Sequence, residues 1–511
     1  MHPSVTEAPP PRRSLASWAA LAVVMVIGSY LVTILLAALC VYLPYLLVTV
    51  TTNIQVLILL VCGVVMAGTM LWSLVPRRDN FVPPGPPLDP ARQPRLFSEL
   101  ESIAAALNEP MPREVYLIPD VNAWVAERGG TMGFGSRRVM GLGLPLMQIL
   151  TLAQFRAVLA HEFGHYYGGD TRLGPWVYKT RATMVRTLRN LASPSAPLRA
   201  LTRIAAARLA HYLVVAGLNA YWTLFLRATQ MVSRRQESRA DELACWVAGS
   251  EALIEGLCSI EKASAAMQAF WQTELAPALQ AGYRPPIAEG FALFVGAPGV
   301  AKALSAHLDT ALRKTTTDRY ATHPPLHARI AAVRSLPSKI PAGSDARAIA
   351  LVDGLDTLEL ELLQARMPAL KPAALRIVQW EKVGVDVYIP LWRGFVAGFA
   401  PLLAGVTVES LPDAASNLAD LSSRMRDPKG MLLTREQRAN RAATLLWMSF
   451  ALALIDHGWE MYAQPGESYL KRDGVPISPP ALVGEMQSGK LSPDAWRAQC
   501  RAMRIADLRL G

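Results

Sequence analysis

The feature that most restricts the fold of this chain is the absence of any charged residue between Arg13 and Arg77. Within that stretch, two apolar runs occupy residues 17–48 and 56–75 and flank a short polar break. A helix needs about 20 apolar residues to cross a bilayer. The pattern therefore predicts a transmembrane helical hairpin over residues 15–76. Two buried core helices are the alternative interpretation.

Arginines at both ends of this hairpin predict its orientation. Arg12 and Arg13 precede it, and Arg77 and Arg78 follow it. Because basic residues collect on the cytoplasmic side, both ends and everything after them are expected in the cytoplasm. A cleaved signal peptide does not fit, since the first apolar run is far too long and a second run follows. Residues 1–14 are expected to be disordered.

A different pattern follows the hairpin. Residues 77–95 are rich in proline and are predicted to form a stiff, extended linker. Helical periodicity then covers residues 96–109, and short strands are predicted at 113–119, 122–127 and 137–145. The fold expected from these elements is mainly α with a small β-sheet, in the α+β class.

The stretch AVLAHEFGHYYGGD lies in a predicted helix whose capping box is formed by Thr151 and Gln154. Residues four apart share a helix face, so His161 and His165 can both present nitrogens to one metal ion. Glu162 can reach a water whose pKa a zinc ion lowers toward about 7, as amide hydrolysis requires. The alternative is two histidines on a helix beside a surface glutamate.

A catalytic zinc also needs a third protein ligand. The contiguous H-E-x-x-H-x-x-G-x-x-H form fails, because its last position is Thr171. His211 lies in an apolar stretch and is better explained as a packed histidine. Glu237 and Asp241 lie four apart in a predicted helix, so Glu237 can bind the metal while Asp241 orients a ligating histidine. A solvated charged face is the alternative. The five cysteines form no C-x-x-C pair, which argues against a cysteine zinc site.

Four stretches resemble the M48 family of membrane-anchored zinc peptidases, which includes the bacterial heat-shock peptidase HtpX and the CAAX prenyl endopeptidases. In chain order they are VNAW (121–124), AVLAHEFGHYYGGDT (157–171), ESRAD (237–241) and THPPLHARI (322–330). Together they are far more specific than the histidine motif by itself. The resemblance covers roughly residues 15–335 and says little about the rest of the chain.

The resemblance implies a gluzincin-type metallopeptidase domain over residues 96–340 with one Zn²⁺ per chain. His161, His165 and Glu237 would hold the zinc, and Glu162 would be the catalytic base. Further roles are implied for Asp170 and Asp241 behind the ligands, for Asn122 and Ala123 on a substrate-binding edge strand, for His323 as a catalytic donor to the oxyanion, and for Arg329 in support. An edge strand suits this task because an extended peptide can pair with it.

The composition of residues 171–232 differs from that expected of a soluble domain. They are rich in basic residues, contain no acidic residue and include the uncharged stretch 209–226, which is long enough to suggest a third span. A single crossing would place Glu237 and His161 on opposite sides of the bilayer. The alternatives are an even number of crossings, a segment that enters and leaves one face, or packing over the site. We favour a membrane-facing insertion, with lipid rather than nucleic acid as its partner, because apolar runs interleave the basic residues.

Residues 341–511 are predicted to be mostly helical. The apolar stretches 387–405 and 442–455 lie there, and the second is shorter than a membrane span. Buried helices of a soluble domain are therefore preferred. The region shows no catalytic constellation, and its role is open.

These patterns favour a membrane-anchored zinc endopeptidase that cleaves unfolded or membrane proteins at the cytoplasmic face. The expected partners are a protein or peptide substrate and the lipid bilayer, without nucleic acid, and the resemblance implies the bacterial inner membrane. One alternative is a zinc-retaining membrane scaffold without activity, against which the intact Glu162 argues. Another is a CAAX-type prenyl-peptide protease, which the small number of predicted spans disfavours.

Overall fold

The computed structural model describes residues 16–51, 53–131, 134–166, 174–192, 205–314, 324–336, 346–427 and 433–510. These residues are mostly helical and include three small β-sheets, so the predicted class is confirmed. The chain divides into two compact units. Residues 1–261 and 308–354 form the first unit, and residues 262–307 and 355–511 form the second.

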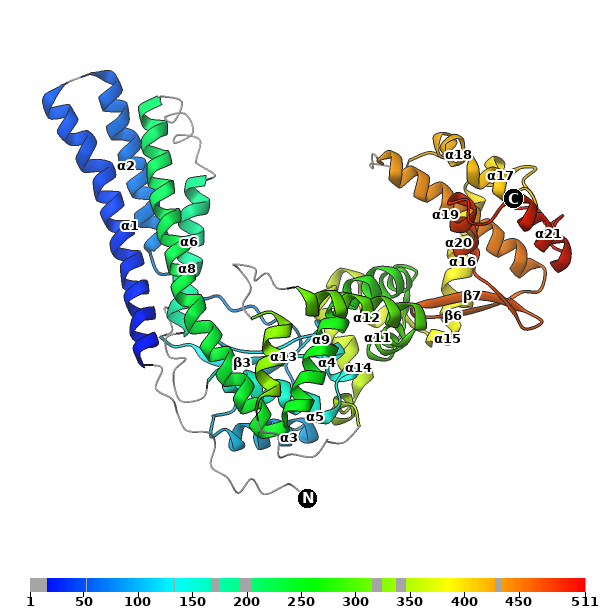
Figure 1. Cartoon of the computed structure of the whole chain (residues 1–511), viewed down its shortest axis with the longest axis horizontal. Coiled ribbons are helices and arrows are strands. Elements are labelled where there is room, and N and C mark those ends of the chain that lie inside the picture. Colours follow the sequence, from blue (N-terminus) through cyan, green and yellow to red (C-terminus); the bar gives the residue numbers. More distant parts are fainter. Residues whose placement is uncertain are drawn as a thin grey trace. The chain divides into compact units, whose positions relative to one another are not determined.

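The first unit begins with the predicted pair of apolar helices, α1 (Ala16–Val50) and α2 (Ile54–Leu74), which lie side by side (Figure 1). They approach closely at Gly63, where an added Cβ would lie 1.9 Å from the carbonyl oxygen of Cys40. Small residues at such positions allow membrane helices to pack closely. Both helices are long and apolar enough to cross a membrane, and both leave many large apolar side chains exposed.

A second helical hairpin packs on the first (Figure 1). It consists of α6 (Gly174–Ala192) and α8 (Ala205–Ala248). Leu191 packs in one cluster with Ala207, and Met184 packs in another with Phe225, so the two helices run antiparallel. Helix α8, like α1 and α2, is long and apolar enough to cross a membrane.

The hairpin of α6 and α8 connects the two halves of the predicted metal site in the chain. The uncharged stretch 209–226 is part of the continuous helix α8. Its apolar face packs on α1, where the Tyr221 hydroxyl donates to the Met25 carbonyl at 2.6 Å. The chain leaves along α6 and returns along α8, so Glu237 comes back to the side of the bundle on which His161 lies.

The predicted strands are all present in a three-stranded sheet of order β1-β3-β2. Strand β1 (Glu114–Ile118) pairs in parallel with β3 (Arg137–Gly143), which pairs antiparallel with β2 (Ala123–Arg128). Strand β2 therefore lies at an edge of the sheet, as an edge-strand substrate site requires.

The proline-rich segment before this sheet packs against it. Leu88 is buried, and its N–H donates to the Val115 carbonyl at 2.8 Å, which extends the β1 edge. Asp79 pairs with Arg128 at 2.9 Å. Prolines make the segment extended, and an extended chain can dock along a strand.

The motif helix α5 (Leu152–Gly164) packs against α8, against α3 (Pro94–Ala106) and against β2. The first unit also continues past residue 340, the expected boundary. Arg347 and Thr151 form an isolated antiparallel β-bridge, and the Ala348 N–H donates to the Leu150 carbonyl at 3.0 Å. The start of α5 is thus held by a segment nearly two hundred residues further along the chain.

The second unit combines residues 262–307 with the C-terminal region, so these residues do not follow the predicted boundary either. Strand β4 (Tyr283–Arg284) pairs with β5 (Arg376–Ile377), and the rings of Phe270 and Trp380 are 6.1 Å apart. The Glu359 carboxylate accepts two backbone N–H bonds at the start of α11 (Ile287–Gly296).

The remainder of the second unit is built around α19 (Arg435–Asp456), which contains the predicted buried stretch 442–455. A three-stranded antiparallel sheet follows, with β6 (Glu460–Gln464), β7 (Glu467–Arg472) and β8 (Val475–Ile477). The helical prediction for this region missed that sheet, because its strands are short and mostly polar on their exposed side.

Candidate metal centre

The helix that carries the histidine motif begins and ends at defined residues. Thr151 and Gln154 form the predicted capping box at its start. His161 is on its last turn, and His165 is the C-cap with φ −62° and ψ −19°, a helical conformation. The two imidazole rings therefore remain on one side of the helix, with centroids 4.7 Å apart.

A close helix contact brings the third predicted ligand to these histidines. An added Cβ at Gly164 would lie 3.0 Å from the Cα of Ala240, so α5 and α8 nearly touch at this point. Gly164 lies between Glu162 and His165 in the sequence, and Ala240 lies between Glu237 and Asp241. The contact of two small residues thus sets the distance between the two halves of the site.

Three predicted ligands converge. His161 Nε2 lies 3.6 Å from a Glu237 carboxylate oxygen, and His165 Nε2 lies 3.5 Å from the other. One ligand atom from each of the three residues lies within 4.8 Å of the others. Two imidazoles and one carboxylate form a donor set that suits zinc and leaves one position open. The residues present therefore fit a catalytic metal ion.

A buried ion pair lies behind His161. Its Nδ1 is 3.0 Å from Asp241, and Arg329 donates to both oxygens of that carboxylate, at 3.0 and 2.5 Å. Arg329 can only donate, so Asp241 must accept, and the Nδ1–H of His161 is best assigned as its second donor. That tautomer leaves Nε2 with a lone pair for a metal.

The charge of Asp241 is favoured in spite of its burial. Burial by itself would raise the pKa of this carboxyl, but the hydrogen bonds with His161 and Arg329 outweigh it and lower the pKa to about 2. Asp241 is therefore an anion under all ordinary conditions, and a negative charge beside the imidazole strengthens it as a metal ligand.

A cavity of about 260 Å³ opens beside the histidine motif. His161, Glu162, Asn122 and Ala123 all line it, so the predicted base and the predicted substrate strand border one space. Leu253, Leu257 and Ile260 of α9 (Ser250–Phe270) add an apolar wall, and Pro324, Leu326 and Arg329 lie on another side.

The free edge of β2 is partly used by the protein itself. The Tyr166 hydroxyl donates to the Val125 carbonyl at 2.9 Å, so the backbone of Val125 points away from β3. In an antiparallel strand, alternate residues point the same way, so the backbone of Ala123 also faces outward. Ala123 borders the cavity and is the position at which an extended peptide can pair with this strand.

Sequence reasoning missed two contributors to this arrangement. Tyr166 holds the edge strand, and Arg138 lies 4.2 Å from the centroid of its ring. Tyr166 directly follows His165 in the motif stretch but occupies none of the positions that the motif defines, and Arg138 lies outside the motif stretches. The apolar wall could have been found, since Leu253, Leu257 and Ile260 follow the i, i+4, i+7 spacing of one helix face. Asp170 and His323, the remaining predicted site residues, lie outside the described residues.

Comparison with known proteins agrees with this geometry. Residues 90–336 match peptidase family M48. No curated protein and no solved structure matches the chain. The matched range contains the histidine motif, Glu237, Asp241 and the edge strand β2, and it ends just after Arg329. The chain thus carries a metallopeptidase domain that belongs to peptidase family M48.

Proposed function

We propose that this protein is a membrane-anchored zinc endopeptidase that cleaves unfolded or membrane proteins at the cytoplasmic face. The observation that carries the proposal is the convergence of His161, His165 and Glu237 beside a cavity that Glu162 also lines. A Zn²⁺ ion bound there would act as a Lewis acid toward a water molecule and the scissile carbonyl.

The side chains of the protein would divide the remaining tasks. The carboxylate of Glu162 accepts the proton of the attacking water and later returns it to the leaving amine. Strand β2 holds the substrate in an extended form through the outward-facing backbone of Ala123. Asp241 and Arg329 keep His161 in one tautomer and orientation. By resemblance, His323 would donate to the developing oxyanion, and Asp170 would support the ligands.

The apolar helices support the location. Helices α1 and α2 would anchor the chain, and the arginines at both ends of the hairpin favour a cytoplasmic catalytic unit. A site held near a bilayer meets unfolded or mis-inserted membrane segments first, which supports the choice of substrate class.

The substitution Glu162→Gln tests the mechanism. It removes the base but none of the three metal ligands, so zinc content should stay at the wild-type level. Casein cleavage should fall by about 100-fold or more, the usual contribution of a general base. Cleavage at the wild-type rate would refute the assigned base. If the wild-type protein binds zinc and cleaves nothing, the scaffold alternative is favoured.

A further inference from the structure

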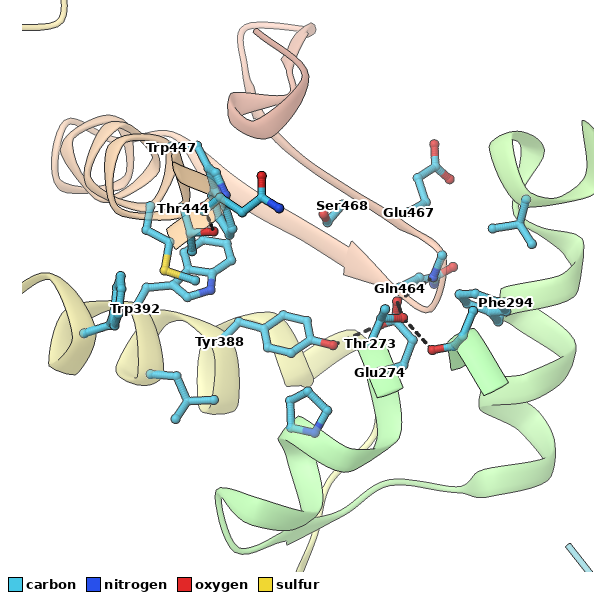
Figure 2. Close-up of a pocket in the computed structure, with 18 of the residues that line it drawn as sticks. Thr273, Glu274, Phe294, Tyr388, Trp392, Thr444, Trp447, Gln464, Glu467 and Ser468 are labelled. Atoms are coloured by element: carbon cyan, nitrogen blue, oxygen red, sulfur yellow. Dashed lines mark hydrogen bonds between the residues drawn. The ribbon is translucent and has the colours of Figure 1, made fainter. Parts of the chain in front are cut away.

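The second unit contains a larger cavity that the proposed mechanism does not use. It measures about 910 Å³ and is shown in Figure 2. Its walls come from the segment after α9, from α16 (Ile389–Ala397), from α19 and from the β6–β7 hairpin. Aromatic and apolar side chains dominate, among them Tyr388, Trp392, Trp447 and Met448.

Two π-helical turns meet at this cavity. Trp271–Leu275 is one and contributes Glu274, and Gly384–Tyr388 is the other and contributes Tyr388. The Tyr388 hydroxyl donates to the Glu274 carboxylate at 3.0 Å, as Figure 2 shows. π-Helical turns are rare and occur frequently at functional sites. Here two π-helical turns each contribute a side chain to the lining of one cavity, and the two side chains are hydrogen-bonded to each other. This arrangement indicates a binding site.

Glu274 lines this cavity, and no basic side chain of the described residues forms an ion pair with it. Its carboxylate accepts from Tyr388, from the Gly466 N–H at 3.3 Å and from the Thr273 hydroxyl at 3.2 Å. Burial outweighs those bonds and raises the pKa of this carboxyl above its ordinary value, and no basic side chain of the described residues contributes to the shift. A half-buried carboxylate with hydrogen-bond donors but no counter-ion among the described residues costs free energy, and a cationic ligand would lower that cost.

The aromatic side chains around Glu274 also favour a cation. The rings of Tyr388 and Trp392 are parallel within 7° and 6.3 Å apart, and Trp447 meets Trp392 edge to face at 5.2 Å. The faces of such rings attract ammonium groups. Arg441 is the basic residue in the lining. Its guanidinium lies over the rings of Phe399 and of Phe395, which also lines the cavity, and it donates to the Arg426 carbonyl.

We propose that this cavity binds an alkylammonium group, with the carbon chain against Trp392 and Trp447 and the charge at Glu274. Glu467, exposed at the rim, adds a second negative charge. A lysine side chain of an extended peptide and a free polyamine both carry this group. The inference concerns a site separate from the metal centre, so it does not depend on the proposed peptidase mechanism.

Calorimetric titration of the full chain in detergent tests the proposal, with n-butylammonium and n-butanol as probes. The two have equal carbon chains, so the comparison isolates the charge and needs no variant. We expect butylammonium to bind about tenfold more tightly or better. Equal affinities, or no binding of butylammonium, would overturn the proposal. Spermidine and a short peptide with either lysine or acetyl-lysine then distinguish the two sources.

A pair of variants locates the site. Glu274→Gln keeps the shape of the side chain and removes the charge, so the affinity for butylammonium should fall about tenfold. Glu460→Gln, at an exposed position of β6 that does not line the cavity, is the matched control and should bind as the wild type does. Unchanged binding by a folded Glu274→Gln variant would refute the assigned location.

Discussion

Glu237 is the carboxylate of the candidate ligand set. It is 4% exposed and approaches two imidazoles, and a carboxylate so buried costs free energy unless positive charge compensates. Replacing Glu237 by alanine should remove one of three ligands and reduce zinc content, measured by elemental analysis, to a small fraction of the wild-type value. Thermal stability should fall as well, because bound metal stabilises the folded state.

A second carboxylate on the same helix provides the control for this experiment. Glu242 pairs with Arg239 at 2.9 Å and belongs to no predicted ligand set. The Glu242→Ala variant should therefore keep its zinc. Full zinc occupancy in Glu237→Ala would show that another residue is the third ligand.

Residue spacing proposed the candidate ligands, the family resemblance selected them from the alternatives, and neither predicted all of their neighbours. His161 and His165 share a face by helix geometry, and Glu237 is related to Asp241 by the same spacing of four. The ion pair between Asp241 and Arg329 joins residues 88 positions apart. No local sequence pattern predicts a contact between residues so far apart in the chain. Only the resemblance suggested a supporting role for Arg329, and the partner came from the structure.

At the scale of elements, the contact between α5 and α8 controls the metal site. The substitution Gly164→Ala would place a Cβ 3.0 Å from the Cα and 3.3 Å from the Cβ of Ala240. Backbone atoms of a helix cannot move aside alone, so the helices must separate. We expect a loss of about 1–3 kcal/mol in unfolding free energy and weaker zinc binding, since Glu237 moves with α8.

The control is the same substitution at another helical glycine. A Cβ at Gly256 would lie 3.5 Å from the nearest atom, an ordinary contact with Gln154. Alanine is the better helix former, so Gly256→Ala should be neutral or stabilising by about 0.5–1 kcal/mol. Equal melting temperatures and zinc affinities for the two variants would contradict the role given to the Gly164 contact.

A pH effect is expected at the start of α11. Glu359 is 2% exposed, and burial raises its pKa above the ordinary value of 4.5, although bonds from Ala288 and Ile287 act the other way. The folded state thus holds this proton more tightly than the unfolded chain. The resulting stabilisation is complete below 4.5 and is lost as the pH rises through the folded-state pKa.

The variant Glu359→Gln cannot titrate at this position. The melting temperature of the wild type, relative to this variant, should therefore be higher in mildly acidic buffer than at neutral pH. Glu381→Gln, at an exposed position of the same unit, is the control and should follow the wild type. A difference between wild type and Glu359→Gln that is independent of pH would contradict the expectation.

At the scale of the whole molecule, the sequence predicted the order of segments better than their grouping. The apolar hairpin, the strand-rich start of the peptidase domain and the ligand helices all follow the predicted order. Residues 262–307 lie within the M48 match but pack with the C-terminal region. Helical periodicity shows that a face is apolar but not which distant segment covers it, so the boundary at 340 had no local signal.

This grouping makes a prediction about truncation. A chain that ends at Gly354 keeps every described metal-site residue but loses the partners of residues 262–307. Trp380, 1% exposed, fills space beside Phe270 and Gly290, and its indole N–H donates to the Pro286 carbonyl at 2.7 Å. Without it, that apolar face is open to water. We expect the shortened chain to bind a hydrophobic dye, to aggregate and to melt at a lower temperature than the full chain.

The substitution Trp380→Ala in the full chain tests the same contact without removing a region. Deleting a fully buried tryptophan costs about 3–5 kcal/mol, and it also leaves the Pro286 carbonyl without this donor. The variant should thus shift the melting temperature in the same direction as truncation and by a smaller amount. If the chain ending at Gly354 were as stable as the full chain and cleaved casein faster, residues 355–511 would restrain the peptidase, and residues 262–307 would not need them to fold.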